Sequence, residues 1–251
     1  MVENENKSLF ALIGKNISYS FSRGYFTTKF SNLGLENHEY VNFDFQNLDE
    51  FPEKLKTHKN NLKGMNVTIP YKLEIFDFLD EIDKEAKIIG AVNTIKITDA
   101  GKLIGFNTDV YGFKKSLQPL LKKYHKKALI LGTGGASKAV AYVLDELGIE
   151  YQFVSRAAKE GNLTYKELNK EIINSHLLII NCTPLGTHPA IENAPEIPYN
   201  DITNKHLLYD LIYNPAETTF LKNGKKMGAD IKNGLEMLEQ QAEKAWEIWN
   251  K

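Results

Sequence analysis

The chain has 251 residues, enough for one large domain or two modest ones with hydrophobic cores of their own. Hydrophobic residues make up 42% and charged residues 25%, which is typical of a globular protein, and the net charge of −1 gives no field that attracts nucleic acid or a membrane. The single cysteine, Cys182, excludes a disulfide framework and a cysteine-based zinc site, and the six histidines form no HxxxH pair, so we expect no metal.

The first residues, MVENENKSLFALIG, lack the basic start and apolar core of a signal peptide. No apolar run approaches the roughly 18 residues of a membrane span. We therefore expect a cytoplasmic protein.

Apolar runs bounded by turn residues recur along the chain and predict strands, with helical patterns between several of them. Such alternation favours an α/β architecture with mainly parallel sheets. The predicted strands cover residues 9–14, 40–45, 64–70, 91–97, 128–132, 151–155, 177–183 and 207–213, and the helical patterns include 73–90 and 138–148.

A domain boundary is expected near residue 107, because residues 109–125 resemble a connecting helix before the strand at 128–132. The last segment is strongly amphipathic, and a terminal helix must bury its apolar stripe, so it could pack back on the first domain. The domains expected are 1–107 completed by the helix 235–251, and 108–234. The stripe consists of Leu235, Leu238, Ala242, Ala245 and Trp249.

The stretch ALILGTGGASKA joins a predicted short strand to a predicted helix through a glycine-rich turn. Gly132 and Gly134 would supply the tight turn and the close backbone approach that a dinucleotide pyrophosphate needs, with the N-terminus of the next helix facing the phosphates. Ser137 stands where the third glycine of GxGxxG would fall, so a plain strand-to-helix turn is the alternative.

The next predicted strand, YQFVS, ends where NAD sites place an acidic residue that binds the ribose 2′-hydroxyl. Here the chain has Ser155 and Arg156, with Lys159 close by. Arginine can bind a 2′-phosphate bidentately, whereas a carboxylate would repel it. The pattern therefore predicts NADP rather than NAD, with an ordinary surface arginine as the alternative.

A third strand, in the stretch LLIINCTPLGT, ends in Asn181, Cys182, Thr183 and Pro184, at the strand end where ligands of open α/β sheets lie. Cys182 has no activating neighbour in the sequence, so we interpret it as a small buried thiol.

Two stretches of the first half set polar residues at the ends of apolar runs, GMNVTIPYK and AVNT through GFNTD. Lys72 and Asp109 stand at their ends and could form a proton-transfer pair. The alternatives are a lysine that extends to solvent at a helix start and an aspartate that caps the following helix.

These motifs resemble the shikimate dehydrogenase family nearly end to end. GMNVTIPYK, AVNT, GFNTD, GTGGAS, NCTPLG, YDLIYNPAETTFL and NGLEMLEQQA follow one another in the family's order, with SRAAK where relatives have N-R-T. The resemblance implies two α/β domains, an N-terminal substrate domain and a C-terminal Rossmann-type cofactor domain, with the terminal helix packing back on the first.

The resemblance also implies a role for each matched residue. Lys72 would be the acid/base residue and Asp109 its partner. The remaining candidates are for substrate Ser20, Ser22, Thr68, Asn93, Tyr213 and Gln241, and for cofactor Gly132, Gly134, Gly135, Ala136, Ser137, Ser155, Arg156, Lys159, Thr183, Leu211 and Gly234.

The first signature departs most from the family pattern. Asn16 and Arg23 replace prolines, Tyr19 replaces a histidine, and Phe26-Thr27 replaces the final His-Asn pair, while both serines are retained. Thr187 stands where relatives often have methionine.

The resemblance implies an NADP-dependent shikimate dehydrogenase that reversibly reduces 3-dehydroshikimate to shikimate in aromatic amino-acid biosynthesis. The alternatives are an NAD-preferring quinate/shikimate dehydrogenase and a non-catalytic regulator that binds NADPH or a shikimate-like acid. We expect a small-molecule substrate, no nucleic acid or membrane partner, and a monomer or homodimer.

Overall fold

The computed structural model describes residues 7–18 and 20–251, so Tyr19 of the first signature lies outside the described residues. The chain divides into two compact units. The first holds Met1–Thr108 together with Ala242–Lys251, and the second holds Asp109–Gln241, so the terminal helix is divided between them.

The first unit is built on a six-stranded mixed sheet with the order β2-β1-β3-β5-β6-β4. Strand β1 pairs in parallel with β2 and β3, whereas β5 runs antiparallel to β3 and β6. The sheet is therefore mainly parallel, as expected, apart from β5. Its strands are β1 (Ser8–Gly14), β2 (His38–Asp44), β3 (Leu62–Val67), β4 (Glu81–Ile82), β5 (Thr94–Ile97) and β6 (Leu103–Phe106).

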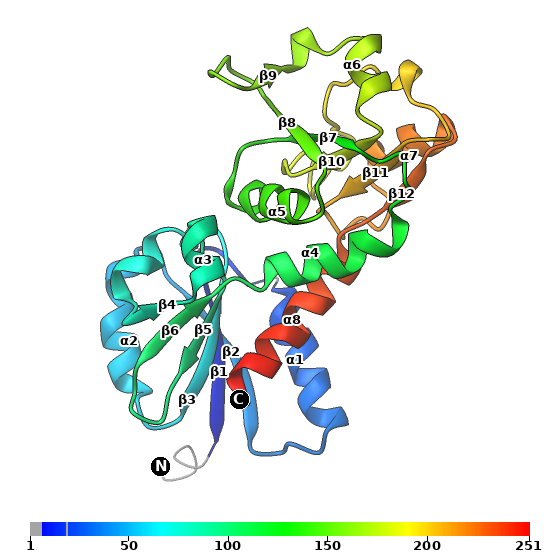
Figure 1. Cartoon of the computed structure of the whole chain (residues 1–251). Coiled ribbons are helices and arrows are strands. Elements are labelled where there is room, and N and C mark those ends of the chain that lie inside the picture. The colour runs from blue at the N-terminus through cyan, green and yellow to red at the C-terminus, as the bar shows by residue number, and fades with distance from the viewer. Residues whose placement is uncertain (1–6, 19) are drawn as a thin grey trace. The chain divides into compact units, whose positions relative to one another are not determined.

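Alternation along β1 gives this sheet two buried faces. Leu9, Ala11 and Ile13 join one hydrophobic cluster, and Phe10 and Leu12 join another. The two faces are covered by different helices (Figure 1). Helix α1 (Phe21–Asn32) and the end of α8 (Leu235–Trp249) cover the second face; α2 (Phe51–Thr57) covers the first, and α3 (Lys84–Ile89) follows β4.

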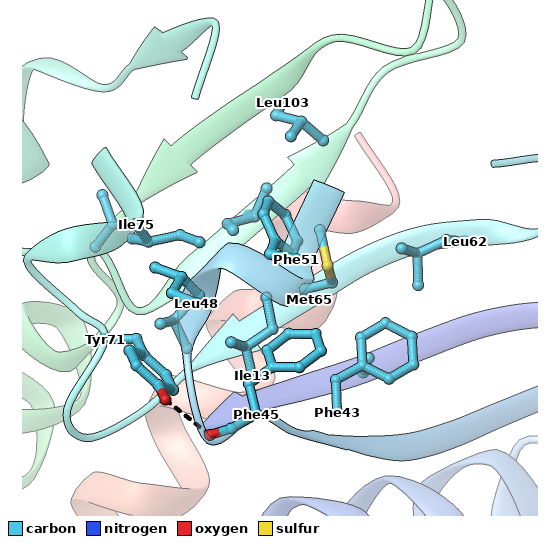
Figure 2. Packing of buried hydrophobic residues seen from close by; sticks show 14 of the residues in the cluster. Ile13, Phe43, Phe45, Leu48, Phe51, Leu62, Met65, Tyr71, Ile75 and Leu103 are labelled. Atoms are coloured by element: carbon cyan, nitrogen blue, oxygen red, sulfur yellow. Dashed lines mark hydrogen bonds between the residues drawn. The ribbon is translucent and has the colours of Figure 1, made fainter. Parts of the chain in front are cut away.

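The first cluster is aromatic and closely packed. Phe51 of α2, labelled in Figure 2, has its ring centre 6.5 Å from that of Phe45, which follows β2 and lies 6.1 Å from Phe43. The Tyr71 hydroxyl donates to the carbonyl of Phe45 at 2.7 Å, drawn as the dashed line in Figure 2. This bond ties the segment that follows β3 to the end of β2.

The helical pattern at residues 73–90 is wrong as a single helix. The segment forms a 3-10 turn (Glu74–Phe78), the short strand β4 and then α3. Sheet pairing overrides the helical periodicity, because the Asp80 carboxylate accepts from the backbone N–H of Leu103 at 2.8 Å and β4 pairs with β6. Asp83 then caps α3 by accepting from the N–H of Glu85.

The second unit is a Rossmann-type sheet of six parallel strands, with the order β12-β11-β10-β7-β8-β9. Its core strands are buried throughout, as both faces of a parallel sheet are covered. The strands are β7 (Lys127–Leu131), β8 (Glu150–Ser155), β9 (Leu163–Thr164), β10 (Leu178–Asn181), β11 (Leu207–Asp210) and β12 (Asp230–Lys232), and the helices are α4 (Asp109–Leu117), α5 (Gly135–Glu146), α6 (Lys170–Ser175), α7 (Thr219–Lys226) and the start of α8.

The predicted stripe of the terminal helix is correct only in its second half. Ala242, Ala245 and Trp249 are buried in the first unit, whereas Leu235 is 38% exposed. Met237 is buried in place of Leu238, which is half-buried. The helix thus buries different faces in its two halves.

Trp249 fixes the end of this helix in the first unit. Its indole N–H donates to the carbonyl of Ile95 at 3.0 Å. Its ring lies so close to Gly64 that a β-carbon there would collide with it. In the part of the chain that the structure describes, no helix combines the length and apolar character needed to span a membrane.

Candidate active site

In the first unit, polar residues gather at the carboxyl end of β3. Thr68 follows this strand, its N–H donates to the carbonyl of Ile13 at 2.8 Å, and its methyl group would lie 2.6 Å from a β-carbon at Gly14. Lys72 is half-buried, and its carbonyl accepts from the N–H of Val92 at 2.9 Å. The backbone therefore holds Lys72 beside the residue that precedes Asn93.

Asn93 is buried with a fixed orientation. Its Oδ1 accepts from the backbone N–H of Thr108 at 2.7 Å and from the hydroxyls of Thr94 and Thr108 at 3.1 and 3.2 Å. These three donors fix the orientation of the Asn93 amide. The structure thus brings Thr68, Lys72 and Asn93 to one edge of the first sheet.

The two serines of the first signature lie at the start of α1. The Ser20 hydroxyl caps this helix by accepting from the N–H of Arg23 at 3.4 Å. Ser22 is 9% exposed and bonds the hydroxyl of Tyr40, which donates to Asn66 Oδ1 at 2.8 Å. Burial raises the pKa of Tyr40, so this hydroxyl remains neutral.

Hydrogen bonds to a carboxylate, rather than prolines, hold the loop at Asn16 and Ile17. Asn16 has φ 56°, a left-handed conformation that proline cannot adopt. The Asp44 carboxylate accepts from the N–H groups of Asn16 and Ile17 at 2.8 and 3.1 Å. The departure at position 16 thus has a structural reason.

In the second unit, Asp109 begins α4 and Gln241 lies on α8, both under 10% exposed. The helices cross at Gly112, where a β-carbon would collide with the carbonyl of Met237 and lie 3.1 Å from Cβ of Gln241. Gly112 is one turn from Asp109, so the crossing brings Asp109 and Gln241 into one neighbourhood. Tyr213 lies in the loop after β11 and is half-buried.

The glycine turn between β7 and α5 has the form expected of a phosphate site. Gly132 has φ 102°, which requires glycine. Gly134 has no such requirement: its φ is −78°, and neither it nor Gly135 has a neighbouring atom within 4 Å of a β-carbon position. Packing within the chain thus does not explain these two glycines, whereas a group lying against the backbone would.

The start of α5 has the polarity to bind an anion. Gly134 caps the helix without a side-chain bond to its first N–H groups, and α5 is 12 residues long. A helix N-terminus of this kind attracts phosphate. Ala136 is half-buried there, and Ser137 is buried, donating to the carbonyl of Gly134 at 2.7 Å. These residues fit a dinucleotide pyrophosphate.

The residues that follow β8 are open to solvent. Arg156 and Lys159 are exposed, and the Ser155 hydroxyl donates to the carbonyl of Ala157 at 2.6 Å, which shapes the turn. A cationic pair at the end of the strand next to the glycine turn fits a 2′-phosphate.

Thr183, Leu211 and Gly234 follow β10, β11 and β12 at the carboxyl edge of the second sheet. A β-carbon at Gly132 would lie 3.1 Å from the methyl group of Thr183. Leu211 donates its N–H to the carbonyl of Asn181 at 3.1 Å, and Gly234 packs directly on its carbonyl. The end of β10 and its loop therefore contact both the glycine turn after β7 and the loop after β11.

Cys182 as a whole residue is half-buried, but its thiol group lies in desolvated surroundings, which agrees with its interpretation as a small buried thiol. The exposure arises because β10 ends at Asn181, which leaves Cys182 in the loop at the sheet edge. Its surroundings nevertheless raise the pKa of the thiol, mainly through desolvation, so it is a poor nucleophile.

Two sets of buried polar residues in these sites were not identified from the sequence. Tyr40 and Asn66 support Ser22 in the first unit, and Asp210 and Thr218 support the loops of the second. The sequence did carry one signal for them, because Asn66 and Asp210 are polar residues within apolar strand patterns. Within residues 7–18 and 20–251, no group of three or more His, Cys, Asp or Glu side chains is placed to hold a metal ion.

These two units, one with a polar strand edge and one with a parallel sheet and a glycine turn, define a two-domain α/β protein of the dinucleotide-binding type. Residues 12–95 match the family model for the shikimate dehydrogenase substrate binding domain. Shikimate dehydrogenase (NADP(+)) of Methanococcus maripaludis strain C6 is 40% identical over 266 residues, covering 99% of this chain and 93% of the relative.

Solved structures agree with this assignment. Shikimate dehydrogenase from Aquifex aeolicus superposes with a TM-score of 0.86 at 35% identity, covering 100% of this chain and 94% of the other. Shikimate 5-dehydrogenase from Thermus thermophilus, in complex with NADP(H) and shikimate, gives 0.84 at 31% identity, covering 96% and 92%. The chain belongs to the shikimate dehydrogenase family.

Proposed function

We propose that the protein is an NADP-dependent shikimate dehydrogenase that reversibly reduces 3-dehydroshikimate to shikimate. The observation that carries this proposal is the near full-length match to relatives with that name, 40% identical over 99% of this chain. A non-catalytic regulator would have no need of both Lys72 and Asp109.

The substrate is proposed to bind through hydroxyl and amide groups, which suit a polyhydroxylated acid. Ser20 and Ser22, near the start of α1, would bind its carboxylate with help from Tyr213. Thr68, Asn93 and Gln241 would bind its hydroxyls. Asn93 is held in one orientation by the three hydrogen bonds that its Oδ1 accepts.

The cofactor is proposed to lie on the second sheet. Backbone N–H groups at Gly134 through Ser137 would bind the pyrophosphate, with Gly132 shaping the turn. Arg156 would bind the 2′-phosphate, supported by Lys159 and by the turn that Ser155 shapes. Thr183, Leu211 and Gly234 would contact the nicotinamide half.

The reaction requires a hydride at the carbonyl carbon and a proton at its oxygen. NADPH, when bound, supplies the hydride. Lys72 would donate the proton from Nζ and stabilise the negative charge that develops on the oxygen, and in reverse its neutral amine would accept the hydroxyl proton. Asp109 would hold the reacting hydroxyl. The atoms balance, because one hydride and one proton convert the ketone to the alcohol.

The function is tested by following nicotinamide absorbance with shikimate or quinate against NADP⁺ or NAD⁺. Turnover is expected to be fastest with shikimate and NADP⁺. Absence of turnover in all four combinations would contradict the enzyme assignment, and a preference for quinate with NAD⁺ would favour the quinate/shikimate alternative.

The catalytic pair is tested separately with Lys72→Met, Asp109→Asn and the double variant. Lys72→Met should lower kcat by about 10²- to 10⁴-fold while NADPH affinity stays near that of the wild type. The double variant should lose much less than the product of the single losses, because groups that act as a unit are non-additive. A Lys72→Met enzyme that keeps most of its kcat would exclude this role.

A further inference from the structure

A buried polar cluster lies directly beneath the proposed nicotinamide loops. It consists of Asn181, Asp210 and Thr218, which are 0%, 0% and 1% exposed. Asn181 ends β10 and Asp210 ends β11, so both stand at the carboxyl edge of the second sheet. Thr218 caps α7.

The Asp210 carboxylate collects three donors from three different segments. Oδ1 accepts from the backbone N–H of Ile212 and from Nδ2 of Asn181, both at 3.0 Å. Oδ2 accepts from the hydroxyl of Thr218 at 2.6 Å. One side chain thus joins the end of β10, the loop after β11 and the start of α7.

Asn181 carries this constraint to the neighbouring loop. Its Oδ1 accepts from the N–H and the hydroxyl of Thr183, at 3.0 and 2.7 Å. Because Nδ2 is directed to Asp210, the amide cannot rotate without losing bonds on both sides. Thr183 in turn lies against Gly132 of the glycine turn.

The loop after β11 is held from two directions. Asp210 binds the N–H of Ile212, and Gly234 donates its own N–H to the carbonyl of Ile212 at 3.1 Å. Leu211, which precedes Ile212, donates its N–H to the carbonyl of Asn181 at 3.1 Å. The peptide groups around Leu211 are therefore fixed before any ligand arrives.

We propose that Asp210 is a positioning residue that, through Asn181 and Ile212, sets the two loops against which the nicotinamide lies during hydride transfer. This inference rests on the proposed function. Misplacement of reacting atoms by about 1 Å can cost about 10²-fold in rate, so a residue that fixes both loops has a large effect on the reaction without touching cofactor or substrate.

Stability alone does not explain a carboxylate at this position. Burial raises the pKa of Asp210 to about 6. For an acid, a folded-state pKa above the unfolded value means that stability falls as the pH rises from the unfolded pKa, about 3.8, to the folded pKa, so the full cost of ionisation is present above about pH 6. A neutral side chain of the same shape should therefore fold at least as well at pH 8.

Asp210→Ala and Asp210→Asn distinguish positioning from general stability. Alanine removes all three bonds. Asparagine keeps an oxygen for Asn181 and Ile212, and its amide can donate to Thr218, whose hydroxyl turns to accept. The asparagine variant should therefore behave nearly as the wild type. His206→Gln serves as the control, because it disturbs buried hydrogen bonds at the amino end of the same strand.

The first measurement is hydrogen exchange of the protein without cofactor. Asp210→Ala should speed exchange at least about tenfold at Thr183 and Ile212, because a lost bond of about 1.4 kcal/mol or more corresponds to this factor. Asp210→Asn and His206→Gln should leave both amides near the wild-type rate. Unchanged exchange at both amides in Asp210→Ala would overturn the proposal.

The second measurement is the primary isotope effect on kcat/KM with NADPH deuterated at the transferred position. Asp210→Ala should lower kcat by about 10- to 100-fold and raise the isotope effect, because misplacement slows the hydride step itself. A variant that merely contains less folded enzyme would show an unchanged isotope effect, and that result would also overturn the proposal.

Asn181→Leu gives an independent check should Asp210→Ala fail to fold. It should speed exchange at Thr183 while Ile212 stays protected by Asp210, and equal acceleration at both amides would contradict the arrangement. If the wild type turned over no shikimate, the proposed function would fail, whereas the exchange data would still decide whether Asp210 holds the two loops.

Discussion

Gly64→Ala should detach the end of the terminal helix from the first unit. A β-carbon at Gly64 would collide with Cδ1 and Nε1 of the Trp249 indole, so the ring must move. Movement also breaks the buried bond from Nε1 to the carbonyl of Ile95, now 3.0 Å long. Overpacking costs about 1–3 kcal/mol and a buried unsatisfied group about 1–3 kcal/mol, so the free energy of unfolding should fall by about 2–6 kcal/mol.

Urea denaturation followed by tryptophan fluorescence measures this fall in the free energy of unfolding, and the fluorescence reports on the affected helix itself. The chain has two tryptophans, Trp246 and Trp249, and both lie on α8. Gly24→Ala is the matched control, because Gly24 lies in α1 with no atom within 4 Å of a β-carbon position. It should stabilise the helix by about 0.5–1 kcal/mol.

A double-mutant cycle identifies the cause. In a Trp249→Leu background the indole is gone, so Gly64→Ala should cost at least about 1 kcal/mol less than in the wild type. An equal cost in both backgrounds, or no cost in either, would refute the packing of Trp249 on Gly64.

Three further substitutions test the site. Arg156→Asp should narrow the NADPH over NADH preference in kcat/KM by about ten- to a hundredfold through a lost charge-assisted contact, and an unmoved ratio would mean that Arg156 does not bind the 2′-phosphate. Gln241→Ala should lower kcat/KM for shikimate with the KM for NADPH kept within about twofold, whereas Gln240→Ala should change neither. Asn16→Pro should destabilise the protein by more than about 1 kcal/mol in thermal unfolding, because proline cannot adopt φ 56° and removes the N–H that Asp44 accepts. Asn16→Gly allows this φ and should leave stability nearly unchanged. Equal stability of the two variants would contradict the loop geometry.

The long strands and the glycine turn could be predicted because local pattern and tertiary burial agree there. The run ALIL forms β7, and the helix after the turn forms α5. The short strands could not be predicted, since β4, β9 and β12 have two or three residues each and exist only through pairing with a longer neighbour. Strand pairing at β4 also interrupted the helical pattern of residues 73–90.

The candidate site could be listed from the sequence only where a motif marked it. Gly132 and Arg156 stand at recognisable distances from predicted strands, and Lys72 and Asp109 stand at the ends of family signatures. The support beneath them could not be found in this way, because Asp210 ends an apolar run and depends on Asn181, which lies 29 residues earlier in the chain. Hydrogen bonds between distant segments leave no periodic signal in a sequence.

The most direct measurement of the proposed reaction is the fate of the hydride. The purified protein would be incubated with 3-dehydroshikimate and NADPH deuterated at the transferred position, and the product analysed by NMR. We expect shikimate with one deuterium on the carbon that carries the new hydroxyl, formed about 10²- to 10⁴-fold more slowly by Lys72→Met. Consumption of NADPH without deuterium at that carbon, or no shikimate at all, would contradict the proposed reaction.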